Sequence, residues 1–224
     1  MKHPRENDGV DIVIVNENCG DNIKQCLEGL FCSTSGHVNI IIIDQASTDG
    51  TRECLQKKRL NHLILNTYDT GIAEGMNQGI IVGRHEWICL LNPAVRVTDP
   101  LWLDKMWDCT FHRGVGLVEG KVRRGEMDIY GGLDFCLISR KCLSEIGLFD
   151  RNLPRGAEKA DLLARIEWAG YQTAFCSDVS AKVLCEHLEV VPASWIGKYH
   201  KMKEKFTENA TRRLRNNLAL NREA

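Results

Sequence analysis

The sequence predicts an α/β fold with a mostly parallel central sheet and helices on both faces. Short apolar runs rich in β-branched residues alternate with stretches of helical periodicity through the first half of the chain. The run over residues 38–43 is almost entirely apolar, which is typical of a strand buried on both faces. Because strands that alternate with helices favour parallel pairing through right-handed crossovers, these two observations predict the fold class.

The expected elements follow in order along the chain. After the first apolar run, residues 21–31 carry apolar side chains at helical spacing, and the turn residues at 47–50 supply cap chemistry for the next helix. We expect strands at residues 10–15, 38–43, 63–65 and 87–91, and helices at residues 21–31, 54–58 and 71–83. In the less regular second half we expect a strand at residues 133–139 leading into a helix that ends at 146, a helix at residues 161–169 and a strand at residues 171–176.

The expected organisation is one domain over residues 1–194 and a basic amphipathic tail over residues 195–224. No internal repeat, low-complexity segment or linker divides the first part, and the tail carries eight Lys or Arg against three Glu. Two roles for the tail stay open. It could form a solvated helix that packs on the domain or pairs with another subunit in a homo-oligomer. Alternatively, it could make peripheral contact with anionic lipid at a membrane.

Charge and hydropathy exclude several classes of protein. The formal net charge of the 224 residues is -1, which argues against a nucleic-acid-binding protein. No apolar run reaches the roughly 18 residues that a membrane span needs, and the N-terminal segment has no apolar signal-peptide region. We therefore expect a cytoplasmic protein.

Ten cysteines are present, and none of them forms a Cys-x-x-Cys pair. We expect them to be reduced thiols in a cytoplasmic setting. The nearest approach to a metal cluster is Cys176, Cys185 and His187, whose spacing matches no standard zinc pattern.

Clusters of polar residues come directly after the first, second and fourth predicted strands. They occupy residues 16–18, 44–50 and 92–94, and a further cluster at residues 69–71 opens a predicted helix. Each cluster could simply cap a helix or form a turn. Because the carboxyl ends of parallel strands meet at one edge of a sheet, their convergence favours a ligand site, where amides and carboxylates could accept from a nucleobase N–H or hold a ribose hydroxyl.

The order and spacing of these segments resembles the family 2 glycosyltransferases of the GT-A (nucleotide-diphospho-sugar transferase) fold. The most specific segment is Ile-Asp-Gln-Ala-Ser-Thr-Asp-Gly-Thr at residues 43–51. The other segments that carry the resemblance are residues 11–18, 26–30, 66–80, 90–95, 135–150 and 158–171. Together they cover roughly residues 10–190.

The resemblance implies a UDP-sugar or another nucleotide-diphosphate sugar as donor, and inverting transfer to a hydroxyl of a saccharide, lipid or protein during glycan biosynthesis. It assigns base recognition to Asp44 and places Asn92 beside the diphosphate. The residues that it places in the nucleotide-sugar site are Asn16, Asn18, Asp44, Ser47, Gly71, Asn77 and Asn92. It also places Glu158 and Asp161 at the acceptor.

Two departures from the family pattern fall on the chemistry. The metal-binding aspartate motif is replaced by Asn92 and Ala94, which argues against Mn²⁺ or Mg²⁺, because a methyl group cannot bind a hard cation. His187 is the metal ligand that remains, and it is a weak one. Lys159 stands where the family has its general base, and an ammonium cannot accept a proton.

These departures leave alternatives open. Glu158 and Asp161 are the carboxylates that could replace the base, and Lys159 could act as a cation near the diphosphate. The chain could be an active glycosyltransferase, a catalytically inactive homologue that binds a nucleotide sugar or a protein, or an unrelated nucleotide-binding α/β enzyme. Trp195 lies just after His187, near the side on which we expect the acceptor.

Overall fold

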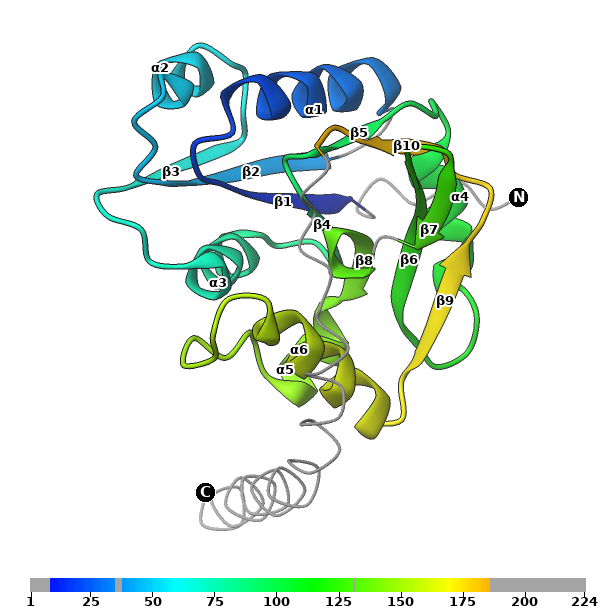
Figure 1. Ribbon diagram of the computed structural model, residues 1–224. Coiled ribbons are helices and arrows are strands. Elements are labelled where there is room, and N and C mark those ends of the chain that lie inside the picture. The colour runs from blue at the N-terminus through cyan, green and yellow to red at the C-terminus, as the bar shows by residue number, and fades with distance from the viewer. Residues whose placement is uncertain (1–8, 35–37, 131, 186–224) are drawn as a thin grey trace. The chain divides into compact units, whose positions relative to one another are not determined.

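A ten-stranded sheet forms the centre of the protein in a computed structural model that describes residues 9–34, 38–130 and 132–185 (Figure 1). The strand order is β3-β2-β1-β4-β8-β6-β10-β5, and β7 and β9 also pair with β6. The strands are β1 (Val10–Asn16), β2 (Val38–Gln45), β3 (His62–Asn66), β4 (Trp87–Leu91), β5 (Val95–Val97), β6 (Val115–Arg124), β7 (Met127–Tyr130), β8 (Phe135–Ser139), β9 (Gln172–Cys176) and β10 (Ala181–Val183). His187, Trp195 and the tail predicted at residues 195–224 lie outside the described residues.

The first four strands of this order are parallel, as the sequence predicts. In their register Ile12 lies beside Ile40 and Asn16 lies beside Asp44, so the polar residues that end β1 and β2 meet. The second half of the sheet is mixed, because β8 runs antiparallel to both β4 and β6. The start of β8 therefore lies beside the end of β4.

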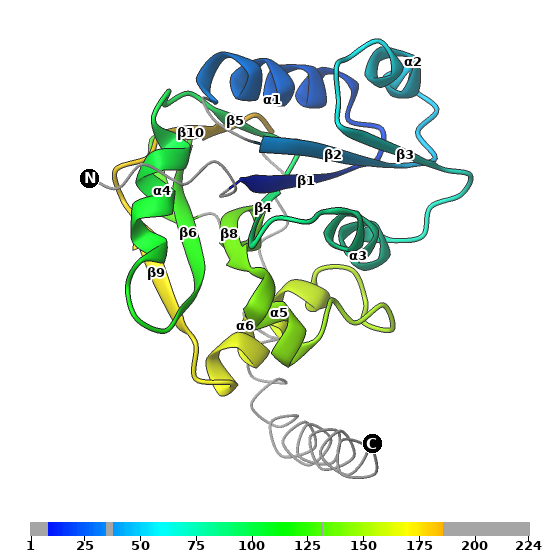
Figure 2. The ribbon, with the colours of Figure 1, turned by 180° about the vertical axis from the view of Figure 1, so that it is seen from behind.

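In the part of the chain that the structure describes there are six α-helices. Views from opposite sides show that they cover both faces of the sheet (Figure 1, Figure 2). They are α1 (Gly20–Ser33), α2 (Thr51–Gln56), α3 (Ile72–Val82), α4 (Trp102–Thr110), α5 (Arg140–Ile146) and α6 (Ala157–Trp168), with a 3₁₀ turn η1 (Gly132–Asp134) before β8. Because side chains alternate along a strand, Ile12 and Ile14 of β1 pack with α1, α2 and α4, whereas Val13 and Val15 pack with α3, α5 and α6. This alternation explains why the predicted strands are apolar throughout.

Helix α3 lies unusually close to the sheet, since it presents glycine to two strands. A Cβ atom at Gly79 would overlap the side chain of Val13, and one at Gly75 would overlap Val15 and Gln45. The glycines in this segment are therefore packing residues, and they hold the beginning of α3 beside the ends of β1 and β2.

The sequence prediction omits the short strands β5, β7 and β10 and the long strand β6. Gly116, Glu119 and Gly120 interrupt the apolar pattern of β6, which hides a strand that is otherwise buried. Helix α6 begins at Ala157, before the predicted start at residue 161, and this places Glu158 and Lys159 in its first turn. Among the residues described, no helix has the length and apolar character required to span a membrane.

Candidate active site

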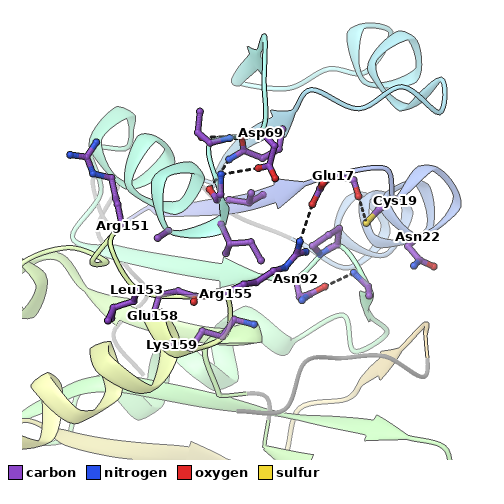
Figure 3. A pocket seen from close by; sticks show the side chains of 18 of the residues that line it. Glu17, Cys19, Asn22, Asp69, Asn92, Arg151, Leu153, Arg155, Glu158 and Lys159 are labelled. Atoms are coloured by element: carbon purple, nitrogen blue, oxygen red, sulfur yellow. Dashed lines mark hydrogen bonds and ion pairs between the residues drawn. The ribbon is translucent and has the colours of Figure 1, made fainter. Parts of the chain in front are cut away.

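A cavity of about 380 Å³ opens at the carboxyl ends of β1, β2 and β4 (Figure 3). The segments after these strands line it together with the start of α3, the loop between α5 and α6, and the start of α6. Asp69 lies on one side of the cavity, and Glu158 and Lys159 lie on the other (Figure 3). Of the sequence-predicted site residues, the cavity brings together Gly71, Asn92, Glu158 and Lys159.

Asn16, Asp44 and Ser47 form a buried network that joins the ends of β1 and β2, and they do not line the cavity. The Asn16 Nδ2 donates to Asp44 Oδ2 at 3.0 Å and to Ser47 Oγ at 3.2 Å. Asp44 is fully buried, and its Oδ1 lies 3.3 Å from Nε of Arg52. These residues therefore join the two strand ends outside the cavity, and Glu17 and Gln45 are the neighbours that reach it.

Asn18 also joins the two strand ends from outside the cavity. Its Oδ1 accepts from the Thr48 N–H at 2.8 Å, and its own N–H donates to Ser47 Oγ at 2.9 Å. Asn18 and Ala46 have φ values of 46° and 55°, which is uncommon for residues other than glycine. The hydrogen bonds of Asn18 hold its tight turn, and the turn places Glu17 on the cavity wall.

Asn77 lies on α3 and anchors the loop between α5 and α6. Its side-chain amide donates to the Phe149 carbonyl at 2.9 Å and accepts from the Phe149 N–H at 3.0 Å. Beyond Phe149 the loop carries Arg151 and Arg155, whose side chains line the cavity. Asn77 thus acts at the site through the loop that it positions.

Arg151 and Arg155 were missed by the sequence analysis. Arg155 reaches Glu17 at 3.3 Å, and Arg151 reaches Glu74 at 3.1 Å. No local motif marks these arginines, because they lie in an irregular loop that contacts with distant residues, Asn77 among them, hold in place. They add two exposed cations to the wall of the cavity.

Asn92, Asp134 and Lys159 form a compact polar network at the side of the cavity where α6 begins. Lys159 Nζ lies 2.7 Å from Asp134 Oδ1, and Asn92 Nδ2 donates to the same oxygen at 2.8 Å. The Asn92 Oδ1 accepts from the Ala94 N–H at 2.8 Å. Lys159 is only 7% exposed, and Asp134 is 7% exposed. The antiparallel pairing of β8 with β4 places Asp134 here, and sequence reasoning missed it.

The two carboxylates that could replace the base differ in their surroundings. Glu158 is 1% exposed and lines the cavity. Asp161 is also buried, but it lies away from the cavity, and its Oδ2 accepts from Arg165 at 2.6 Å and 2.9 Å. Burial raises the pKa of the Asp161 carboxyl, and Arg165 opposes that shift. Of these two carboxylates, only Glu158 therefore belongs to the lining of the cavity.

Glu119 of β6 supports the turn that carries Asp134, because its Oε2 accepts from the Gly132 N–H at 3.2 Å. Burial raises the pKa of the Glu119 carboxyl, and this hydrogen bond opposes the shift. Folding thus favours the protonated form of Glu119. The contribution of this carboxyl to stability is fully present below its ordinary pKa and is lost as pH rises through its pKa in the folded protein.

The variant Glu119→Gln is expected to melt at a higher temperature than the parent at neutral pH, by about 2–4 °C. Its amide oxygen can still accept from Gly132, while the cost of ionising a buried carboxyl is removed. Thermal denaturation across a pH series should show that the difference in melting temperature between the variant and the parent is small near pH 4, about the ordinary pKa of Glu, and grows as pH rises. Glu126→Gln, in an exposed turn, is the matched control. A difference in melting temperature that does not change with pH would contradict a raised pKa of the Glu119 carboxyl.

The family model for glycosyl transferase family 2 matches residues 11–124, just over half of the chain. The chain belongs to glycosyl transferase family 2. The match begins in β1 and ends in β6, so it contains Asp44 and Asn92 and ends before Asp134. Membership rules out the unrelated nucleotide-binding enzyme that the sequence analysis left open.

This family 2 chain is similar to one curated relative and to several solved structures. It is 29% identical over 96 residues to the Escherichia coli UDP-Glc:alpha-D-GlcNAc-diphosphoundecaprenol beta-1,3-glucosyltransferase WfaP, a match over 42% of this chain and 36% of the relative. A mannosyltransferase from Pyrobaculum calidifontis, in complex with GDP-Man and Mn²⁺, is 18% identical with a TM-score of 0.64, over 82% of this chain and 57% of that one. S. aureus TarS 1-349 is 14% identical with a TM-score of 0.65, over 78% and 60%.

These likenesses establish the GT-A fold of the family 2 chain, as the sequence predicts. The chain spans about a third of the curated relative's length. Within the described part of the chain, all ten cysteines are free thiols, and no group of three or more His, Cys, Asp or Glu is arranged to hold a metal ion. His187, the weak metal ligand of the sequence analysis, lies outside that part.

Proposed function

We propose that this chain transfers a sugar from a nucleotide-diphosphate donor, bound in the cavity at the carboxyl edge of the sheet, to a hydroxyl of an acceptor. The observation that carries the proposal is that this cavity gathers carboxylates, amides and cations from six segments at the edge where parallel sheets bind ligands. Family membership supports the reaction class, because the matched residues include the ends of β1, β2 and β4.

The nucleotide end of the donor is assigned to the side formed by β1, β2 and the start of α3. Glu17, Gln45 and Asp69 offer polar groups there. Gly71 has a φ of 85°, and no atom lies within 4 Å of the place where a Cβ would stand. Asn16, Asn18, Asp44 and Ser47 keep this wall in place through their mutual hydrogen bonds. Direct base recognition by Asp44 stays a prediction, since its carboxylate is buried beneath the cavity.

The reacting end is assigned to the start of α6. Glu158 accepts the proton of the acceptor hydroxyl, while the hydroxyl oxygen forms a bond to the anomeric carbon of the donor. The bond from that carbon to the diphosphate oxygen breaks on the opposite side, so the nucleoside diphosphate leaves with its electron pair and the configuration inverts. Asp161 positions the helix through Arg165, whose guanidinium donates to the Leu148 carbonyl at 2.9 Å and to the Ile146 carbonyl at 2.9 Å.

A lipid-linked saccharide is the acceptor class that we favour among the saccharide, lipid and protein acceptors. The E. coli relative, to which this chain is 29% identical over 96 residues, takes a GlcNAc-diphosphoundecaprenol acceptor. Peripheral membrane contact through residues 195–224 would suit such an acceptor and stays a prediction, as do cytoplasmic location and a homo-oligomer.

Isothermal calorimetry of the full chain with UDP, GDP, UDP-glucose and GDP-mannose tests the proposal. We expect one nucleotide to bind, and its sugar conjugate to be hydrolysed slowly or transferred to a lipid-linked GlcNAc acceptor. Tight binding without hydrolysis or transfer would instead support the catalytically inactive homologue. Failure to bind any of the four would contradict the proposed transferase and would favour the inactive homologue that binds a protein.

A further inference from the structure

The network of Asn92, Asp134 and Lys159 places a buried ammonium at the cavity, close to Asn92, which the family resemblance places in the metal-binding motif. Lys159 belongs to the lining of the cavity, and its Nζ is held 2.7 Å from Asp134. Asn92 in turn holds Asp134 through two hydrogen bonds, one from its side chain and one from its backbone N–H to the Asp134 carbonyl, each at 2.8 Å. The ammonium is therefore held by Asp134, which Asn92 holds in turn.

The residues present do not fit a divalent cation. Ala94 has no ligand atom, and the Asn92 side-chain oxygen already accepts from the Ala94 N–H. Oδ1 of Asp134 already accepts from both Lys159 and Asn92. A dication at this place would also meet the positive charge of Lys159, and hard cations bind through carboxylate and carbonyl oxygens that are free to coordinate.

The position of Lys159 is not explained by stability. It is the third residue of α6, and a cation in the first turn of a helix opposes the helix dipole. Burial of a lysine–aspartate pair brings little net stabilisation, because desolvation offsets the attraction between the charges. A buried cation in the first turn of a helix, directed to the wall of a cavity, is accordingly a candidate for function.

We propose that Lys159 is the cation that the site presents to the diphosphate of the donor, so that donor binding requires no divalent metal ion. This inference rests on the proposed function. An ammonium has three N–H donors, and the contact with Asp134 uses one of them. The others can donate to phosphate oxygens, and a cation held in place by Asp134 and Asn92 stabilises the charge of the leaving group without rearrangement.

Calorimetry with UDP and GDP, and with uridine and guanosine as probes that lack phosphate, tests the inference on the full chain. We expect the affinity of the unmodified protein for the diphosphate to be the same with excess EDTA and with added Mn²⁺. The variant Lys159→Met should weaken diphosphate binding by about ten- to a hundredfold and leave nucleoside binding unchanged, because charged hydrogen bonds to phosphate are lost. Added Mn²⁺ should not restore the loss.

Two further variants keep the result interpretable. Lys159→Met combined with Asp134→Asn removes both charges, so that no carboxylate is left buried without its partner, and it should show the same selective loss. Lys105→Met is the matched control, because Lys105 also lies 2.7 Å from an aspartate, Asp99, but does not line the cavity. It should bind the diphosphate normally.

Diphosphate binding that EDTA abolishes and Mn²⁺ restores would overturn the inference and leave the proposed function standing. The same holds if a folded double variant retains full diphosphate affinity. If the unmodified protein binds none of the nucleotides or nucleosides, the inference and the proposed function fail together.

Discussion

Replacing Glu158 by glutamine should lower the rate of sugar transfer by about 10²–10⁴-fold, the usual contribution of a general base. Glu158 is the buried one of the three carboxylates that line the cavity, the others being Glu17 and Asp69. Glutamine has nearly the same shape but cannot take up the proton, so the loss should appear in kcat.

The donor affinity of Glu158→Gln should remain unchanged, since the base contacts the acceptor hydroxyl and not the nucleotide. Steady-state transfer kinetics and donor calorimetry on the same preparation separate the two effects. Glu167→Gln is the matched control, because Glu167 is exposed on the same helix. A Glu158→Gln protein that transfers sugar at the parental rate would show that another group accepts the proton.

Replacing Arg140 by alanine should lower the free energy of unfolding by about 1.5–3 kcal/mol, because the buried Asp11 carboxylate would lose a charged hydrogen bond and keep only those from Asn39 and His85. Asp11 is 0% exposed, and Arg140 donates to its Oδ2 at 2.9 Å. The guanidinium also donates to the Ile80 carbonyl at 2.8 Å and to the His85 carbonyl at 2.7 Å. Arg140 thus ties the start of α5 to the end of α3 and to β1.

Urea denaturation measures this loss. Arg123→Ala is the control, because Arg123 contacts Asp128 at the same short range, 2.7 Å, but is exposed, and we expect no measurable change from it. Adding Asp11→Asn to Arg140→Ala should recover part of the stability, since the buried charge is then removed. An Arg140→Ala protein as stable as Arg123→Ala would contradict the view that the buried charge requires its partner.

Several site residues predicted from sequence lie at the cavity, and others act from beneath it. Gly71, Asn92, Glu158 and Lys159 line it. The buried residues Asn16, Asp44 and Ser47 do not, because the chain turns tightly after β1 and β2 and directs these side chains toward each other. A motif reveals which residue types occur at a strand end, but the direction of each side chain depends on backbone turns such as those at Asn18 and Ala46.

The α/β class, the four parallel strands and the edge that holds the site follow from the sequence alone. Apolar periodicity and the order of strands and helices are properties of neighbouring residues, and right-handed crossovers leave few ways to connect them. Asn92, Ala94 and Lys159 are also visible there as departures from the family pattern.

Only the tertiary structure shows that Asn92 and Lys159 lie together, joined through Asp134. Asp134 lies 42 residues beyond Asn92 and 25 before Lys159, and no periodicity relates the three. The antiparallel pairing of β8 with β4, and the packing of α6 on the same face as α3 and α5, bring them into one hydrogen-bonded network. Contacts between residues far apart in the chain depend on how whole elements pack, and that is why Asn92 and Lys159, two separate departures in the sequence, share one network in the folded protein.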